Sequence, residues 1–184
     1  WSIMPTMGDS IESATSVMKL LLDKTGLSLD DINYILATGY GRVNVPFAKK
    51  EISEITCHAT GAFWQFPETR TILDIGGQDV KAIKVNDKGM VTKFLLNDKC
   101  AAGTGRYLER ISATFGMNLK DIGPMALQAT ADPLPEVSST CTVFATEEMT
   151  WWLRRGEDPK NIIAGATKSL VERLTIFVDR IGLE

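Results

Sequence analysis

The chain has 184 residues, 44% of them hydrophobic and 23% charged, a balance typical of a globular protein. We expect no membrane span, because no uninterrupted apolar run is long enough for one, and we expect no signal peptide. A formal net charge of -3 provides no basic surface, which argues against nucleic acid as a partner. Three widely separated cysteines argue against a disulfide framework and favour a reducing cytoplasm.

Both ends of the chain are unlike those of a complete protein. Trp1 is not an initiator methionine, and the C-terminal residues stop where a helix should lead into another element. We therefore expect a fragment of a longer protein.

The first part of the chain alternates helical and extended patterns. A helix is expected between Asp9 and Gly26, a strand over 34–37 and a second helix over 49–66. The glycines of 38–42 fit a strand end that lines a ligand cleft, but they fit an ordinary loop equally well. Pro67 is the candidate domain boundary.

The second part begins with a predicted meander of three strands, which leads into a series of helices. The strands are expected over 71–75, 80–85 and 90–96. Helices are expected over 100–115, 119–129 and 145–155, and from 159 to 181, with a polar, strand-prone segment over 137–144.

The turn after the first meander strand has the composition of a phosphate-binding loop. A phosphate there would meet the backbone N–H groups of Gly76, Gly77 and Gln78, and Asp74 would hold Mg²⁺ through water. Glycine lacks a Cβ atom and so allows close approach. The alternative is an ordinary hairpin.

Cys100 is placed at the expected start of a helix, with Asn97 or Asp98 as its cap. The positive end of a helix favours a thiolate and an anionic partner. Gly103 and Gly105 are costly inside a helix, so they suggest close approach of a backbone or a ligand.

Cys141 has an equivalent place ahead of the helix expected from 145. Two cysteines are too few for an iron–sulfur cluster, which four thiolates usually hold, but a symmetric dimer would supply the other two. The alternative is two unreactive core thiols. The neighbouring Trp151 and Trp152 mark either a partner surface or two half-buried aromatic residues.

Five motifs occur in order along the chain, namely ATGYGR (37–42), ITCHATGA (55–62), LDIGGQDVK (73–81), NDKCAAGTGR (97–106) and SSTCTVFA (138–145). Together they closely resemble one family of ATPases, the BadF/BadG/BcrA/BcrD type. This family comprises the activators (component A) of 2-hydroxyacyl-CoA dehydratases and the ATP-hydrolysing subunits of benzoyl-CoA reductase.

The resemblance implies an α/β fold of the actin, Hsp70 and sugar-kinase class, built from two ribonuclease H-like domains that close on ATP. Residues 1–67 would be the remainder of the first domain, and 68–184 a truncated second domain. The family's first phosphate loop and its adenosine motif are missing. We therefore expect ATP hydrolysis from the full protein and not from this stretch alone.

The resemblance also implies the site residues. Cys100 and Cys141 would ligate a [4Fe-4S] cluster shared across a homodimer or a pseudo-symmetric heterodimer, and Cys57 matches a family cysteine that is not a ligand. ATP or ADP with Mg²⁺ would bind at the second phosphate loop, where Asp74 and Gln78 would be catalytic. The residues expected to contact the nucleotide are Gly76, Gly77, Gln78, Gly103, Thr104 and Gly105.

The implied activity is ATP-driven transfer of low-potential electrons, from ferredoxin or flavodoxin to an acyl-CoA dehydratase or reductase component. Two other readings stay open. A sugar or acid kinase on the same fold would use Asp74 and the glycines but neither cluster cysteine. A nucleotide-binding or structural subunit of a larger complex would place Trp151 or Trp152 at the contact.

Overall fold

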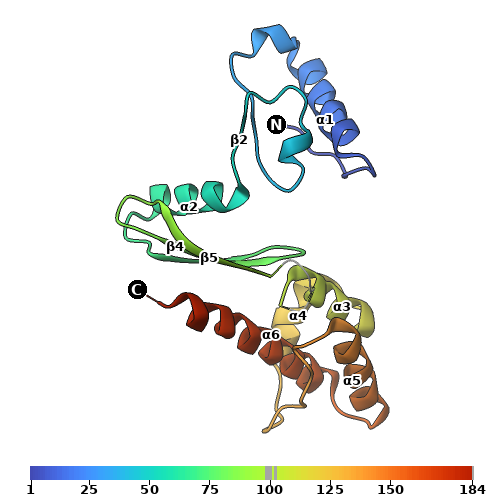
Figure 1. The fold of residues 1–184 in the computed structure, drawn as a ribbon. Coiled ribbons are helices and arrows are strands. Elements are labelled where there is room, and N and C mark those ends of the chain that lie inside the picture. Colours follow the sequence, from blue (N-terminus) through green and yellow to red (C-terminus); the bar gives the residue numbers. More distant parts are fainter. Residues whose placement is uncertain (98–100, 102, 184) are drawn as a thin grey trace. The chain divides into compact units, whose positions relative to one another are not determined.

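The structure, a computed structural model, describes residues 1–97, 101 and 103–183. The chain forms two compact units, Trp1–Gly61 and Ala62–Glu184. Figure 1 labels the helices and strands of both units. Within the part of the chain that the structure describes, no helix has both the length and the apolar character that crossing a membrane requires.

The first unit opens with helix α1 (Ser10–Thr25), as predicted. Asp9 caps this helix, since its Oδ1 accepts from the N–H of Ile11 at 2.7 Å. Gly26 ends it with a φ of 70°, a left-handed conformation that glycine adopts without strain. The capping residues therefore determine both ends of this helix.

Between α1 and α2 (Glu54–Gln65), the first unit consists mostly of loops, with two single turns of helix and two short strands. A single-turn helix, η1 (Leu29–Asp31), leads to strand β1 (Leu36–Ala37). A second single turn, η2 (Arg42–Asn44), leads to β2 (Lys50–Glu51), which pairs with β1 in parallel. The glycine-punctuated loop after β1 is therefore part of a parallel strand connection.

The predicted start of the second helix at residue 49 is wrong. Helix α2 runs over Glu54–Gln65, because Lys49 and Ile52 donate backbone hydrogen bonds to the β1 segment and keep the chain extended. The Oγ of Ser53 then accepts from the N–H of Thr56 at 3.2 Å, as an N-capping side chain does. Long-range strand pairing thus overrides the local helical pattern.

The second unit contains the predicted meander. Strands β3 (Thr71–Ile75), β4 (Val80–Val85) and β5 (Val91–Asn97) form an antiparallel sheet in the order β3-β4-β5. The third strand begins one residue later than predicted. Asp74 lies opposite Lys81 in the register.

Helix α3 (Gly105–Phe115) follows the sheet and begins later than predicted. Ala101, Gly103 and Thr104 are not helical, and Gly103 has a φ of 86°, so the predicted helical start at residue 100 is wrong. The N-cap is Thr104, and Asn97, one of the two predicted caps, ends β5 instead. Asp98, the other predicted cap, lies outside the described residues.

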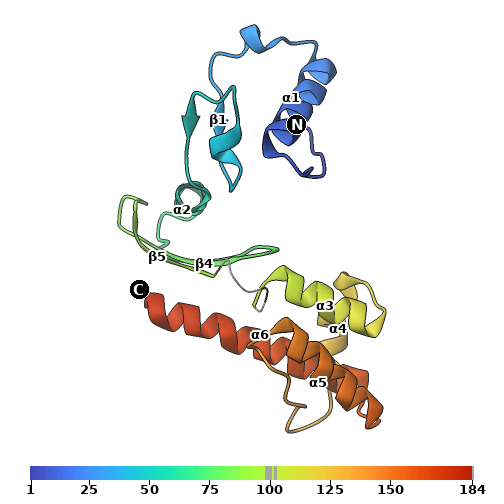
Figure 2. The same cartoon turned by 45° about the vertical axis from the view of Figure 1, so that its right-hand side comes forward.

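The remaining helices pack together with α3. Figure 2 shows α4 (Ile122–Ala126), α5 (Thr142–Arg154) and the long α6 (Pro159–Ile181) gathered beside it. The predicted helix over 119–129 is a single turn, η3 (Leu119–Asp121), followed by the short α4. Apolar side chains from these helices and from β4 form the core, namely Val80, Tyr107, Ile111, Ile122, Val137, Ala145, Met149, Ile162, Ile163, Ala166, Leu170 and Leu174.

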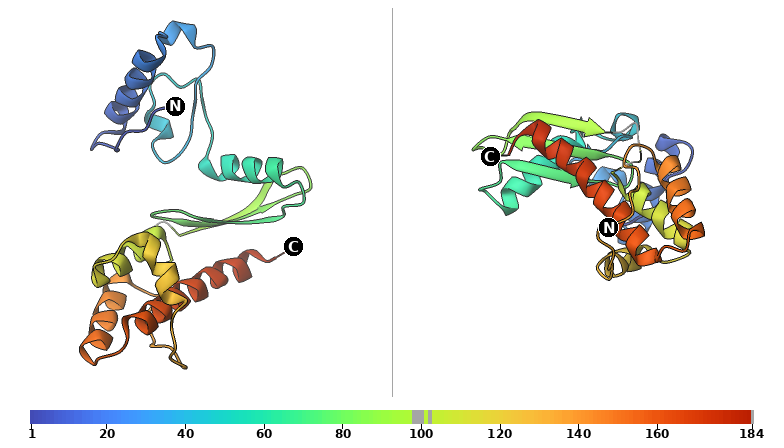
Figure 3. Two further views of the ribbon diagram at one scale, coloured as in Figure 1. Left: turned by 180° about the vertical axis from the view of Figure 1, so that it is seen from behind. Right: turned by 90° about the horizontal axis from the view of Figure 1, so that it is seen from below.

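Helix α5 begins at Thr142, three residues before the predicted start at residue 145. Residues 142–144, which are expected from the sequence to belong to a strand-prone segment, are therefore helical. Cys141 is the N-cap, and its carbonyl oxygen accepts from the N–H of Ala145 at 3.0 Å. Helix α6 runs along β4 and β5, as Figure 3 shows. It lies on the face that carries Lys93, whose Nζ donates to the carbonyl oxygen of Arg180 at 3.0 Å.

Candidate functional site

The glycine turn, residues 76–79 between β3 and β4, is closed by a hydrogen bond within its own backbone. The N–H of Gly76 donates to the carbonyl oxygen of Asp79 at 2.9 Å. A Cβ atom on Gly76 would lie only 2.6 Å from Oδ1 of Asp79, so only glycine allows this side chain to fold back over the turn. The hydrogen bonds among the described residues do not use the N–H groups of Gly77 and Gln78. Within the described part of the chain, no other acceptor therefore competes with a phosphate for these two groups.

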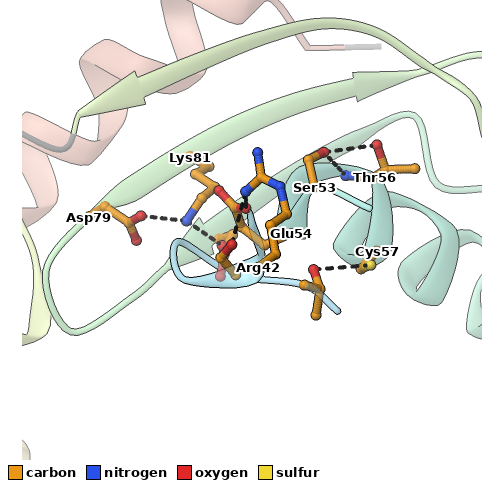
Figure 4. A network of polar contacts seen from close by, with 10 residues as sticks. Arg42, Ser53, Glu54, Thr56, Cys57, Asp79 and Lys81 are labelled. Carbon is orange, nitrogen blue, oxygen red and sulfur yellow. Dashed lines mark hydrogen bonds and ion pairs between the residues drawn. The ribbon is translucent and has the colours of Figure 1, made fainter. Parts of the chain in front are cut away.

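A buried lysine joins the carboxylates on either side of the turn. Nζ of Lys81 lies 2.6 Å from Oδ2 of Asp79, a contact that Figure 4 shows, and 3.5 Å from Oδ2 of Asp74. Lys81 is 3% exposed, whereas the Asp74 side chain is 20% exposed and open to solvent on one side. The hairpin register places Asp74 and Lys81 directly opposite each other. The turn is therefore held by ionic contacts as well as by its backbone.

The protonation of Lys81 follows from these contacts. Burial is the largest single influence and acts to lower the pKa of Lys81, but the hydrogen bonds and the charges of Asp79 and Asp74 together outweigh it. The pKa of Lys81 is raised from its ordinary value of 10.5. Lys81 is therefore a fixed cation beside the glycine turn.

The first turn of helix α3 rests on the same glycine turn. The N–H of Gly105 donates to the carbonyl oxygen of Gly76, and the N–H of Arg106 donates to that of Gly77, both at 2.9 Å. A Cβ atom on Gly105 would lie 3.1 Å from Cα of Gly77, tighter than ordinary packing. The glycine at the helix start is thus required by close approach of two backbones. The structure brings together two segments that the sequence singled out separately.

The segment around Cys100 is partly described. Cys100 itself lies outside the described residues. Gly103 and Thr104, which follow it, form a turn in which Oγ1 and the N–H of Thr104 both bond to the carbonyl oxygen of Ala101, at 2.6 and 3.1 Å. Thr104 is fully buried. This turn fixes the path of the chain from the Cys100 segment into helix α3.

Cys141 is a half-buried free thiol at the N-terminus of α5. The loop before it is anchored at Ser138, whose N–H donates to Oε2 of Glu148 at 2.5 Å. The hydroxyl of Tyr107, on α3, donates to the carbonyl oxygen of Ser138 at 3.3 Å and shares a 3.0 Å contact with Oγ of Ser169. The helix that follows the Cys100 segment therefore touches the loop that carries Cys141.

Tyr107 is buried at this junction, 1% exposed. Burial raises the pKa of its phenol above the ordinary 10.0, the hydrogen bond with Ser169 lowers it and the charge of Glu148 raises it, with a net rise. The hydroxyl therefore stays protonated over the physiological range and can donate.

Two buried polar atoms beside the cysteine segments have no partner among the described residues. They are Oγ1 of Thr142, next to Cys141, and Nε of Arg173, next to Gly103. Buried donors are normally satisfied, so these two point to an acceptor that lies beyond the described residues. A cluster with thiolate and sulfide ligands is an anion that accepts hydrogen bonds, and the residues present fit such a group. No group of three or more His, Cys, Asp and Glu able to hold a metal is found among the described residues.

The two tryptophans of α5 differ in their exposure: Trp152 is partly buried and Trp151 is exposed. The ring of Trp152 packs against the core and its Nε1 donates to the carbonyl oxygen of Glu136 at 3.1 Å. Trp151 is 49% exposed, meets Trp152 edge to face at 4.7 Å, and carries the guanidinium of Arg155 over its ring at 4.5 Å. Only Trp151 is therefore available at the surface.

Sequence reasoning missed two residues of this region. Lys81 is the last residue of the LDIGGQDVK motif, and pairing the two strands around a short turn would have placed it opposite Asp74. Arg173 gave no signal, because it lies on α6, 34 residues from the Ser139 carbonyl oxygen that it contacts.

The chain is similar to dehydratase activators. It is 49% identical over 160 residues to the activator of lactoyl-CoA dehydratase from Anaerotignum propionicum, covering 87% of this chain and 61% of that protein. It is 41% identical over 177 residues to the 2-hydroxyisocaproyl-CoA dehydratase activator from Clostridioides difficile, covering 96% of this chain and 66% of that protein. The chain thus spans less than two thirds of the length of these relatives.

A solved structure gives the same result. The activator of the 2-hydroxyisocaproyl-CoA dehydratase from Clostridium difficile with bound ADPNP matches with a TM-score of 0.83 and 40% identity, over 99% of this chain and 66% of that one. This match confirms the predicted actin-like ATPase fold. A family model matches residues 4–184, so the chain belongs to the BadF/BadG/BcrA/BcrD ATPase family.

Proposed function

We propose that the complete protein is an ATP-dependent donor of low-potential electrons to an acyl-CoA dehydratase or reductase partner, with a [4Fe-4S] cluster shared across its dimer. The observation that carries the proposal is the pair of hydrogen bonds from Gly105 and Arg106 to the glycine turn. These bonds join the phosphate-binding candidate directly to the helix that follows the Cys100 segment. The membership of the chain in an ATPase family supports the proposed use of ATP.

The nucleotide half of the site is the turn between β3 and β4. In this proposal the N–H groups of Gly77 and Gln78 receive a phosphate, and the Lys81 cation balances part of its charge. Asp74, which is partly open to solvent, holds Mg²⁺ through water, and Gln78 orients the attacking water. ATP hydrolysis belongs to the complete protein, because this chain spans only 61–66% of the length of its relatives.

The cluster half of the site uses Cys100 and Cys141 from each of two subunits. The cluster, when bound, supplies one-electron transfer at low potential. The first N–H groups of α5 lie beside Cys141 and favour a thiolate and an anionic group there. Tyr107 and Glu148 hold the loop that carries this cysteine.

Coupling between the halves follows from their shared backbone contacts. A change in the glycine turn on nucleotide binding is transmitted to the first turn of α3, because the carbonyl oxygens of Gly76 and Gly77 are the acceptors at that helix start. Helix α3 in turn contacts the Cys141 loop through Tyr107. Nucleotide-dependent closure then alters the surroundings of both cysteine segments.

We further propose that residues 1–67 are the remainder of a first ribonuclease H-like domain and 68–184 part of a second. The compact units of the structure meet between Gly61 and Ala62, within helix α2. The free thiols of Cys57 and Cys141 suit a reducing cytoplasm.

The test is ATP-dependent activation of a 2-hydroxyacyl-CoA dehydratase by the complete protein, under anaerobic conditions with reduced ferredoxin or flavodoxin. We expect wild type and the control Cys57→Ala to activate the dehydratase. Cys141→Ala should bind ATP normally and fail to activate. ATP-dependent phosphorylation of a small hydroxylated substrate without any partner would instead support a phosphotransferase.

A further inference from the structure

Arg173, on helix α6, reaches both cysteine-bearing segments. Its Nη1 donates to the carbonyl oxygen of Ser139 at 3.1 Å, two residues before Cys141. The position of a Cβ atom on Gly103 lies 3.3 Å from Cδ and 3.7 Å from Nε of Arg173. Gly103 is three residues after Cys100. One side chain therefore lies against both segments.

Gly103 is suited to this contact for two reasons. Its φ of 86° is a conformation that other residues rarely adopt. Its missing side chain also leaves the space in which the stem of Arg173 lies. The arginine thus packs against the turn between Cys100 and α3 while its guanidinium holds the loop before α5.

The charge of Arg173 has no carboxylate partner among the described residues. Lys168, on the same helix, is paired with Glu172 at 3.8 Å, and both of these side chains are exposed. In contrast, Nε of Arg173 is buried and has no hydrogen-bond acceptor within the described chain. A buried Nε–H donor on a cationic side chain is poorly satisfied unless an acceptor approaches from beyond the described residues.

We propose that Arg173 is a positioning residue for the cluster, tying the two cysteine segments together and holding beside them a positive charge that no carboxylate of the described residues pairs. This inference rests on the proposed function. Reduction adds one negative charge to a cluster, so a nearby cation stabilises the reduced form more than the oxidised form. Arg173 therefore raises the midpoint potential and fixes the geometry of the ligands.

The first experiment measures the midpoint potential by redox titration of the anaerobic complete protein, monitored by electron paramagnetic resonance. Arg173→Gln removes the charge, Arg173→Lys keeps it, and Lys168→Gln removes a charge from the exposed side of the same helix. We expect a more negative potential in Arg173→Gln only, with iron content as in wild type.

A second readout does not need the cluster. In metal-free protein that also carries Cys57→Ala and Cys100→Ala, the rate of maleimide alkylation reports the exposure of Cys141. We expect Arg173→Gln to increase this rate several-fold, because the loop loses its hydrogen bond at Ser139, and Lys168→Gln to leave it unchanged.

The outcomes separate the two proposals. Wild-type protein without iron overturns the proposed function and, with it, the role of Arg173. Iron-loaded protein in which Arg173→Gln changes neither the potential nor the alkylation rate overturns the role of Arg173 alone. If Arg173→Gln takes up no iron, Arg173→Lys decides. Iron uptake at the wild-type potential supports the role, and iron uptake at a potential clearly more negative than that of wild type overturns it.

Discussion

The backbone N–H of Gly105 donates a 2.9 Å hydrogen bond to the carbonyl oxygen of Gly76, which joins the first residue of α3 to the glycine turn. A helix normally begins at a side-chain cap, but the N-cap here, Thr104, makes no capping bond with its side chain. The glycine turn supplies the acceptors instead. The start of α3 therefore depends on a segment about thirty residues earlier in the chain, from which strands β4 and β5 separate it.

Gly105→Ala tests this junction. The new Cβ would lie 3.1 Å from Cα of Gly77, and the two hydrogen bonds between these backbones oppose the shift that would relieve the contact. We expect a loss of about 1–3 kcal/mol in the free energy of unfolding, measured with denaturant. Gly123→Ala is the matched control, because its Cβ meets nothing within 4 Å in helix α4. Equal stabilities of the two variants would contradict the close approach.

Lys81→Met tests the ionic contacts of the turn. The substitution leaves the carboxylates of Asp79 and Asp74 without their buried cation. We expect the free energy of unfolding to fall by about 3 kcal/mol. Lys88→Met, at the exposed turn between β4 and β5, should change stability by less than about 0.5 kcal/mol. A Lys81→Met protein as stable as this control would show that the contacts are unimportant.

Alkaline pH should weaken the fold through Tyr107. Its pKa is raised on folding, so its contribution is complete below the unfolded value of 10.0 and is lost as pH rises through the higher folded value. We expect stability to decline above about pH 10. Lys81, whose pKa is also raised from 10.5, acts in the same direction.

Tyr107→Phe separates these two contributions. At neutral pH it should cost about 0.5–1.5 kcal/mol, because the hydrogen bonds at Ser138 and Ser169 are lost. The decline at alkaline pH should become shallower and keep only the Lys81 part. An unchanged pH profile in thermal unfolding would refute the assignment to Tyr107.

Glu148→Ala tests the anchor of the Cys141 loop. Glu148 accepts from the N–H of Ser138, and a hydrogen bond to a charged group contributes about 1.5–3 kcal/mol. We expect a loss of that size in the free energy of unfolding. Glu147→Ala changes the exposed neighbour on the same helix and should be near neutral. The anchor has no importance if the two substitutions prove equivalent.

The sequence predicts those parts of the fold that local chemistry determines. The meander follows from alternating apolar residues and turn residues, and α1 from Asp9 and Gly26. The predicted starts of α2 and α3 are wrong, because hydrogen bonds to distant backbone determine the real ones. These bonds go to the β1 segment before α2 and to the glycine turn at the start of α3. No local pattern carries that information.

The candidate site shows the same division. The glycines of the turn and Cys141 stand out in the sequence because their residue types are unusual in their settings. Lys81 and Arg173 do not, since strands and helices carry many cations and only tertiary structure shows which are buried against carboxylates or beside a cysteine loop. The assignment of roles to Asp74, Gln78 and Cys100 stays a prediction.

The most direct test of the central claim is the iron and acid-labile sulfide content of the complete protein, purified anaerobically as a dimer. We predict about four irons and about four sulfides per dimer in wild type and in Cys57→Ala, and loss of both in Cys100→Ala and in Cys141→Ala. Iron-free wild-type protein that still dimerises and binds ATP, or full iron content in Cys141→Ala, would contradict the account.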